Sequence, residues 1–244
     1  MSSKPTLTCV VPARNEAGHL KTLIESISSV AEIDKIVIVE GGSTDDTFEI
    51  ATQIASQHPE RITCLKQTGK GKFNAVLEGV NTQNTEFSMI WDADGTVPVS
   101  ASSLIIKKAL DEQCFSMGDR LRGNIETGAM QIANKIGNWA FAFLWAPIIK
   151  RRPTDIFCGT KVAPTEVFKK VPLEMISHDP YGDISLLLSA RLLGVAINPV
   201  TVDYNSRVYG ESKMRRWKMG MVFSKLTITS YIKLLDSKIQ RKNV

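Results

Sequence analysis

The sequence is poor in the side chains that bind structural metals or form disulfides. Its three histidines and four cysteines are scattered along 244 residues, and no pair has the spacing of a zinc finger. We therefore expect neither a zinc site nor a disulfide framework. Unpaired cysteines of this kind favour a reducing, cytosolic environment.

A long hydrophobic run is also missing. The nearest candidate, residues 136–149, contains Pro147 and is shorter than the roughly 18 to 20 apolar residues that a membrane-spanning helix needs. The N-terminus has no apolar signal-peptide core. With 43% apolar and 23% charged residues, the composition is that of an ordinary globular protein.

Positive charge is concentrated near the C-terminus. Residues 207–244 contain ten lysines or arginines and two acidic residues and carry +8, whereas residues 1–206 carry −3. We therefore predict one large domain over residues 1–206, followed by a basic, amphipathic helical tail over residues 207–244. No segment of the tail resembles a nucleic-acid recognition motif, so nucleic acid is not expected as a partner.

Strand and helix signals alternate in the first half of the chain. Apolar runs predict strands over residues 7–11, 35–39, 62–65 and 87–91, with amphipathic helices between them. Pro12 is expected to end the first of these strands. The second half is less regular but contains further helical and strand segments. This alternation predicts a Rossmann-like α/β fold, with a mostly parallel sheet covered by helices on both faces.

Two aspartates follow the fourth predicted strand. In an open α/β sheet, ligands bind at the carboxyl ends of the strands, so Asp92 and Asp94 are expected at the mouth of the sheet. Mg²⁺ and Mn²⁺ take oxygen ligands and share their shell between carboxylates and substrate phosphates. The pair therefore predicts a site for Mg²⁺ or Mn²⁺ facing a diphosphate. A capped turn is the alternative interpretation.

The first strand also ends in polar residues. Pro12 is followed by Arg14 and Glu16, which we expect near the edge of the sheet. Asn15 is expected to cap the following helix. This position suits contacts to a nucleotide.

The segments after the second and third strands fit the same ligand. Glu40, Gly42 and Ser43 lie in a turn where glycine lets the backbone bend closely around a ligand, and Glu40 is placed to accept hydrogen bonds from a base or ribose. Lys70 and Lys72 flank a glycine at a predicted helix start, which suits phosphate binding, although a solvated role for Lys72 stays open. Because all four segments end consecutive strands, we predict a nucleotide-sugar site.

These segments resemble those of the family 2 glycosyltransferases, which have the GT-A fold. Residues 12–16 are similar to the family's Pro-x-Tyr/Arg-Asn-Glu motif, and residues 40–45 to its Val-Asp-Asp/Gly-Gly-Ser-x-Asp turn, with Glu40 in place of the usual aspartate. Asp92-Ala93-Asp94 matches the family's metal-binding pair. The resemblance implies a hexosyltransferase with a nucleotide-diphosphate sugar as donor and Mg²⁺ or Mn²⁺ as cofactor.

Within this family, the chain resembles the dolichyl- or polyprenyl-phosphate sugar synthases. Residues 207–213 are similar to their Arg-x-Phe/Tyr-Gly-Glu-Ser-Lys segment, and residues 155–161 to their Asp-x-x-x-Gly-x-Arg/Lys segment. The resemblance assigns phosphate contacts to Arg120. It places the acceptor beside Arg120, Arg207, Ser212 and Lys213.

The resemblance further implies inversion at the anomeric carbon by direct displacement. A phosphate acceptor is already ionised near neutral pH and needs cationic positioning groups, whereas a hydroxyl acceptor needs a general base. Asp183 resembles the acidic residue that family members place beside the acceptor, and helix capping is its alternative role. We favour a lipid-linked acceptor such as polyprenyl phosphate. Transfer to a hydroxyl in cell-surface glycan synthesis and a non-catalytic binding module remain alternatives.

Two segments raise the question of membrane contact. Residues 139–145 contain four aromatics and precede the basic triplet 150–152, which fits either a buried helix or an interfacial one. Residues 213–242 predict a basic amphipathic helix with Met221, Phe223 and Leu226 on its apolar side. We expect a cytoplasmic protein attached peripherally to the inner face of a membrane.

Overall fold

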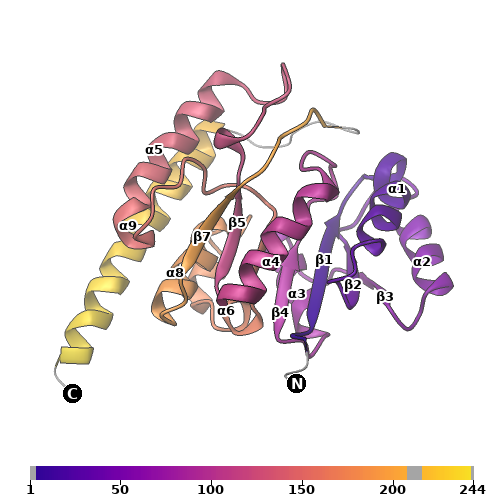
Figure 1. Cartoon of the computed structure of the whole chain (residues 1–244), viewed down its shortest axis with the longest axis horizontal. Coiled ribbons are helices and arrows are strands. Elements are labelled where there is room, and N and C mark those ends of the chain that lie inside the picture. Colours follow the sequence, from indigo (N-terminus) through magenta and orange to yellow (C-terminus); the bar gives the residue numbers. More distant parts are fainter. Residues whose placement is uncertain (1–3, 208–215, 243–244) are drawn as a thin grey trace.

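The computed structural model describes residues 4–207 and 216–242, which fold around a seven-stranded sheet of order β3-β2-β1-β4-β6-β5-β7 (Figure 1). The strands are β1 (Leu7–Ala13), β2 (Lys35–Glu40), β3 (Ile62–Lys66), β4 (Phe87–Ile90), β5 (Phe115–Asp119), β6 (Lys161–Pro164) and β7 (Ile197–Thr201). The helices are α1 (Ala17–Ser28), α2 (Thr47–Gln57), α3 (Lys72–Asn81), α4 (Ser102–Glu112), α5 (Ile132–Ile149), α6 (Thr165–Lys169), α7 (Leu173–Ile176), α8 (Asp183–Leu192) and α9 (Arg216–Lys242).

The sheet is mostly parallel, as predicted. β3, β2, β1 and β4 run in one direction, and β5 and β7 also pair in parallel. β6 is antiparallel to both β4 and β5. β6 therefore begins at the edge where β4 ends, and Ile90 pairs with Lys161 there.

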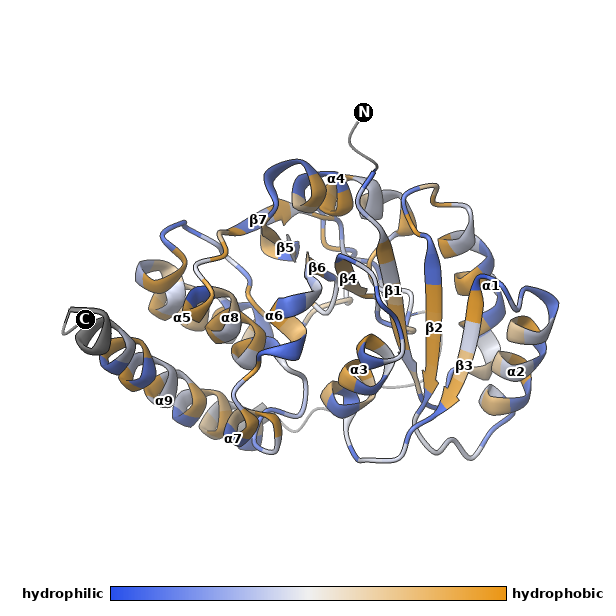
Figure 2. Cartoon of the chain, turned by 90° about the horizontal axis from the view of Figure 1, so that it is seen from below, coloured by the Kyte–Doolittle hydropathy of each residue, from blue (hydrophilic) through white to orange (hydrophobic). Residues whose placement is uncertain are grey.

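Side chains of the central strands alternate between two cores. Cys9 and Val11 of β1 pack with residues of α1 and α4, whereas Val10 packs with residues of α3 and α8. Figure 2 shows α3, α6 and α8 on the side of the sheet opposite α4. Because both faces are covered, the strands are nearly continuous apolar runs.

β1 continues through Pro12 to Ala13, so the prediction that Pro12 ends this strand is wrong. The carbonyl of Val10 accepts a hydrogen bond from the Trp91 N–H, 3.0 Å away, just after β4. Pro12 lies two residues further along β1, so its backbone nitrogen faces the same neighbouring strand as that of Val10. At this point β4 has already ended. The missing N–H of Pro12 therefore costs no ladder hydrogen bond, and on the other side Pro12 stays in register with Val39.

The described C-terminal residues form one long helix that packs on the domain. α9 lies against α8 and α5, and the Trp145 indole N–H donates to Thr227 Oγ1 at 3.1 Å. Phe223 and Leu226, which the sequence places on the apolar side of this helix, are buried in the core and face the domain. Among the described residues, no helix has both the length and the apolar character needed to cross a membrane.

Candidate functional site

A cleft of about 1660 Å³ opens at the carboxyl ends of β1 and β4. The start of α3, the loop before β6 and the first turns of α5 and α9 complete its walls. Most of the predicted site residues line it, namely Pro12, Arg14, Glu16, Gly42, Lys70, Lys72, Asp92, Asp94, Arg120, Asp183 and Arg207. Glu40 and Ser43 are not on this lining, and Ser212 and Lys213 lie outside the described residues.

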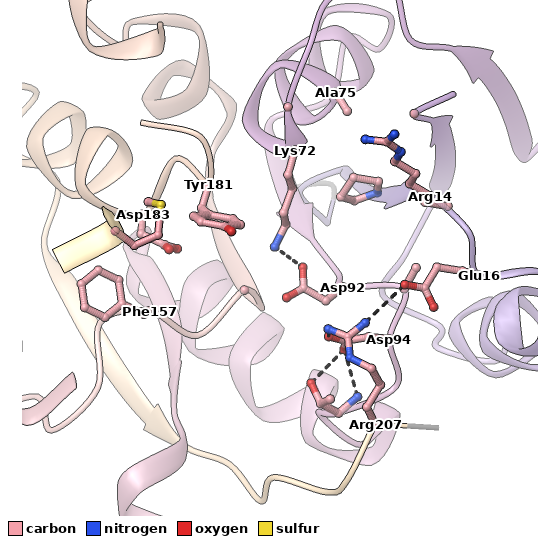
Figure 3. Close-up of a pocket in the computed structure, with 18 of the residues that line it drawn as sticks. Arg14, Glu16, Lys72, Ala75, Asp92, Asp94, Phe157, Tyr181, Asp183 and Arg207 are labelled. Carbon is pink, nitrogen blue, oxygen red and sulfur yellow. Dashed lines mark hydrogen bonds and ion pairs between the residues drawn. The ribbon is translucent and has the colours of Figure 1, made fainter. Parts of the chain in front are cut away.

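Asp92 follows β4 and faces the first residue of α3. Lys72 forms an ion pair with Asp92 Oδ1 (Figure 3). Burial alone would raise the pKa of Asp92, but the charges of Lys72 and Lys161 outweigh burial and lower it. Burial would likewise lower the pKa of Lys72, yet the charges of Asp92 and Asp183 raise it. A Cβ at Gly159 would lie 1.8 Å from Asp92 Oδ2, so a side chain there would displace this carboxylate.

Asp94 is held by a residue from the far end of the described domain. Its Oδ2 lies 2.7 Å from Arg207 Nη2, and its Oδ1 accepts hydrogen bonds from the Thr96 N–H at 3.2 Å and the Thr96 hydroxyl at 2.8 Å. Arg207 Nη1 also lies 3.4 Å from Glu16 Oε1 (Figure 3). Arg207 thus joins the segment after β7 to the ends of β1 and β4.

The donor set of this cleft fits Mg²⁺ or Mn²⁺ better than zinc. The described residues contain no cluster of three or more His, Cys, Asp or Glu side chains able to hold a metal. Asp92 and Asp94 remain, and both line the wide cleft. Mg²⁺ is commonly held by one or two carboxylates together with substrate phosphates, so a pair of aspartates in an open cleft suits it.

Arg120 follows β5 and is fixed by two neighbours. Its Nε lies 2.5 Å from Asp155 Oδ2 and its Nη2 lies 3.1 Å from Asp155 Oδ1. The guanidinium also sits 4.9 Å from the centre of the Tyr204 ring. Burial opposes the charged form, but Asp155 raises the pKa of Arg120 above its usual value. The cation is therefore permanent, and Arg120 lines the cleft.

Asp183 lies at the start of α8 and is paired with a lysine of β6. Its Oδ1 is 2.5 Å from Lys161 Nζ, and both residues are buried. Lys161 also donates to the carbonyl of Cys158. The sequence placed Lys161 in a motif but did not predict this partner, because the pairing depends on where β6 begins.

Asp179 performs the capping role that was the alternative for Asp183. Its Oδ1 accepts the Gly182 N–H at 2.9 Å, and its Oδ2 accepts the Ser185 N–H and hydroxyl, each at 2.9 Å. Burial and the nearby charge of Asp183 raise the pKa of Asp179. Gly182 has φ +80° in this turn, a conformation that favours glycine.

The turns after β1 and β2 hold each other in place. Asn15 does not cap α1, so that prediction is wrong; it has φ +56° and its Oδ1 accepts the Thr44 N–H at 2.9 Å. The Asn15 N–H donates to Ser43 Oγ at 3.0 Å. Glu40 is buried, and its Oε1 accepts the Ser43 N–H at 2.5 Å. Glu40 and Ser43 thus shape the turn, while Gly42 reaches the cleft with φ +73°.

An apolar end of the cleft was not predicted. The rings of Phe141, Phe157 and Phe223 lie 4.4 to 6.0 Å apart, and Tyr181 lies 6.5 Å from Phe223. Figure 3 shows Phe157 and Tyr181 on either side of Asp183. The aromatic segment was visible in the sequence, but only the packing of α5 against α9 turns Phe141 and Phe223 toward the cleft.

A family model described as glycosyl transferase family 2 matches residues 8–169. The match covers more than half of the chain and includes both aspartates after β4. The chain belongs to glycosyl transferase family 2. This confirms the resemblance that the motifs at the strand ends indicated.

Several curated proteins are similar over most of the chain. Glycosyltransferase AglJ of Haloferax volcanii is 26% identical over 84% of this chain and 65% of its own length. Dolichyl-phosphate beta-glucosyltransferase ALG5C of Trichomonas vaginalis is 25% identical over 85% of this chain and 66% of its own length. This family 2 chain therefore spans about two thirds of the length of these curated relatives. The UDP-N-acetylglucosamine–dolichyl-phosphate N-acetylglucosaminyltransferase of Methanococcus voltae is 21% identical over 93% of this chain and 97% of its own length.

A solved structure supports the fold assignment. Glucosyl-3-phosphoglycerate synthase from Mycobacterium tuberculosis, in complex with Mn²⁺, UDP and glucosyl-3-phosphoglycerate, superimposes with a TM-score of 0.66. The two sequences are 19% identical, and the match covers 94% of this chain and 80% of that one. The family 2 chain therefore has the GT-A arrangement of a mostly parallel sheet with helices on both faces.

Proposed function

We propose that this protein is an inverting, metal-dependent glycosyltransferase. It transfers a hexose from a nucleotide-diphosphate sugar to a lipid-linked acceptor, for which we favour polyprenyl phosphate. One observation carries the proposal: Asp92 and Asp94 line the same cleft as the partly buried cations Lys72, Arg120 and Arg207 and an aromatic cluster. A metal-bound diphosphate requires carboxylates, a phosphate requires cations, and a lipid chain requires apolar side chains.

At the donor end, Asp92 and Asp94 would hold Mg²⁺ or Mn²⁺. When bound, such an ion neutralises charge on the departing diphosphate. Lys72 is already turned toward Asp92 and would lie beside the same phosphates. Pro12, Arg14, Glu16, Gly42 and Lys70 are proposed to surround the nucleotide, and Glu40 and Ser43 to shape the turn that contacts it. Similar proteins are named for dolichyl phosphate, and a structural neighbour contains Mn²⁺ and UDP, which supports this assignment.

At the acceptor end, a phosphate nucleophile fits better than a hydroxyl. A hydroxyl needs a general base within hydrogen-bond reach. Asp183, the candidate base, is paired at 2.5 Å with the buried Lys161 and is therefore already engaged. An ionised phosphate needs no base, and Arg120 and Arg207, which line the cleft, offer cations to position it. The basic segment that contains Ser212 and Lys213 is proposed to complete this acceptor side.

A lipid-linked acceptor also sets the place of action. We propose that the protein works in the cytoplasm, attached peripherally to the inner face of a membrane where polyprenyl phosphates are reached. The similarity to proteins named as dolichyl-phosphate transferases supports this location.

The donor half of the proposal is tested by calorimetry with UDP-glucose, GDP-mannose and UDP-N-acetylglucosamine in the presence and absence of Mn²⁺. We expect one of these donors to bind only with the metal, and Asp94→Asn to weaken this binding at least tenfold. Asp111→Asn, on the exposed end of α4, is the matched control and should bind as the wild type does. Metal-independent binding, or none at all with any donor, would contradict the enzymatic assignment.

The acceptor half is tested by incubating the labelled donor with a membrane lipid extract. Transfer to polyprenyl phosphate predicts a labelled product that partitions into organic solvent and is released by mild acid. A labelled, water-soluble polymer would instead support transfer to a hydroxyl in cell-surface glycan synthesis. Donor binding without any labelled product would support the non-catalytic binding module.

A further inference from the structure

We propose that the exposed faces of α5 and α9 together form a docking surface for an anionic bilayer. This inference deepens the proposed function by naming the surface that would carry the enzyme to its lipid-linked acceptor. It stands on the distribution of apolar and basic side chains over two neighbouring helices.

The outer face of α5 is apolar along its whole length. Every exposed side chain between Ile132 and Pro147 is apolar. The largest are Ile132, Ile136, Trp139 and Phe143, which recur at the spacing of one helix face and are 76%, 63%, 59% and 68% exposed. The rings of Trp139 and Phe143 stack at 6.0 Å. An ordinary solvated helix alternates such residues with charges, whereas α5 contains a single charged residue, the partly exposed Lys135.

α9 presents a second stripe beside the first. Met221, Ile228, Ile232 and Leu235 are exposed on one face, and Lys225 occupies the turn between Met221 and Ile228. Phe141 contacts Phe223, and the Leu144 carbonyl accepts the Tyr231 hydroxyl at 2.5 Å, so the helices run side by side in the same direction (Figure 1). The two stripes thus belong to adjacent helices of the same outer layer.

Basic residues border these stripes. Lys218 and Lys225 are exposed on the same face of α9 as Met221 and Ile228. At the end of α5, a groove of about 470 Å³ has apolar walls from Phe143, Leu144, Pro147 and Tyr231 and a rim of Lys150, Arg151 and Arg152. Apolar side chains next to lysines and arginines match the boundary between acyl chains and anionic headgroups. If the occupant were a protein partner or a second copy of this chain, the basic rim would have no comparable explanation.

The position of this surface relative to the cleft supports the same occupant. Ala133, Gly137, Met219 and Gly220 in the first turns of α5 and α9 line the cleft that contains Asp92 and Asp94. A bilayer lying against the two stripes would therefore meet the cleft at its apolar end. A lipid-linked phosphate would reach Arg120 from the membrane without leaving it.

The inference is tested by sedimentation with vesicles of phosphatidylcholine alone or with 30% phosphatidylglycerol. We expect the wild type to bind the anionic vesicles at least tenfold more tightly than the neutral ones, and high salt to weaken this binding. Trp139→Glu combined with Phe143→Glu should reduce binding to anionic vesicles at least tenfold. Arg151→Glu combined with Arg152→Glu should remove the preference for the anionic lipid. Leu104→Glu and Lys107→Glu, exposed on α4, are the matched controls. They should change neither the binding to anionic vesicles nor the preference for the anionic lipid.

A second readout keeps the test independent of folding defects and of catalysis. Brominated acyl chains should quench the wild-type tryptophan fluorescence, and Trp139→Phe should lose most of this quenching while it still sediments with vesicles. Equal binding of the wild type and the Glu variants, or no binding to either vesicle, would overturn the inference. Light scattering that shows a dimer lost in Trp139→Glu would assign the face to a second copy instead. Donor binding is measured without vesicles, so failure of the docking surface and failure of the proposed function are separate results.

Discussion

At the scale of single residues, Asp92 and Asp94 have different cationic neighbours. Asp92 is paired with Lys72 from the adjacent α3, while Asp94 is paired with Arg207 from beyond β7. A metal ion at the pair would share Asp94 with Arg207. Arg207 is therefore expected to compete with the metal and, once displaced, to lie free beside the acceptor.

This competition predicts that Arg207→Gln binds Mn²⁺ more tightly in the absence of nucleotide. Arg207 and Asp94 are 29% and 14% exposed, so the lost ion pair is worth about 1 kcal/mol and the expected gain is about fivefold. Electron paramagnetic resonance of free Mn²⁺ during titration measures the affinity. Arg122→Gln, whose side chain is half exposed on the turn after β5, serves as the control. Unchanged affinity in Arg207→Gln would show that Arg207 and the metal do not share Asp94.

The pair of Lys72 and Asp92 predicts a defined pH window. The pKa of Asp92 is lowered in the folded protein, so its contribution to stability is complete above its usual 3.8 and is lost as the pH falls through the lowered value. The pKa of Lys72 is raised, so its contribution is complete below its usual 10.5 and is lost as the pH rises through the raised value. We expect Lys72→Met to lower the melting temperature by a constant amount between about pH 5 and 9. Lys107→Met, on the exposed surface of α4, should show no such difference, and thermal melts at each pH measure both variants.

At the scale of secondary-structure elements, the antiparallel β6 is what places a buried lysine against Asp183, a residue that lines the cleft. Because β6 starts where β4 ends, Lys161 meets Asp183 at the start of α8. The pair is buried, so removal of either partner leaves an uncompensated charge in the interior. Its effect on stability must therefore be separated from any effect on turnover.

A double-mutant cycle makes this separation. Asp183→Asn and Lys161→Met are each expected to destabilise the fold by about 3 kcal/mol, whereas the double variant should lose less than the sum. Urea denaturation measures the free energies of unfolding. If Asp183 is a base for a hydroxyl acceptor, Asp183→Asn abolishes turnover even below its melting temperature; with a phosphate acceptor, turnover is only reduced. Additive losses in the cycle would contradict the coupling of this pair.

At the scale of the whole molecule, α9 belongs to the same core as the sheet. Phe223 and Leu226 share one buried cluster with residues of α5 and α8, and Ser230 is fully buried against them. The helix thus closes the apolar end of the cleft as well as presenting a face to the outside. Its packing, and not only its charge, connects the C-terminal residues to the predicted domain over residues 1–206.

This integration predicts that a chain ending at residue 206 is less stable. Loss of the buried side chains of α9 exposes the face of α8 and α5, and we expect a fall in melting temperature of more than 10 °C together with binding of a hydrophobic dye. Phe223→Ala alone should cost about 3 to 5 kcal/mol, whereas Ile228→Ala on the exposed face should cost less than 1 kcal/mol. Calorimetry measures all three. A truncated chain that melts like the full chain would show that α9 is an independent appendage.

The sequence by itself determined the alternation of strands and helices and the polar residues at the strand ends. These are local properties, because burial on both faces demands apolar runs and each strand must end in a turn. Asp92, Asp94, Lys72 and Arg14 could be expected at one edge for this reason, and the structure brings them to one cleft. The prediction that Asn15 caps α1 was wrong because its side chain accepts a hydrogen bond from the neighbouring turn and not from its own helix.

Only the tertiary structure decided which charges meet and which apolar faces remain exposed. Arg207 and Asp94 are 113 residues apart in the chain, and nothing local in either segment specifies their contact. The direction of β6 sets the partner of Asp183, and the packing of α9 on α8 buries Phe223 while leaving Ile228 outside. These contacts form because elements that are distant in the sequence pack together at the same time. The free energy of that packing does not come from any single segment of the sequence.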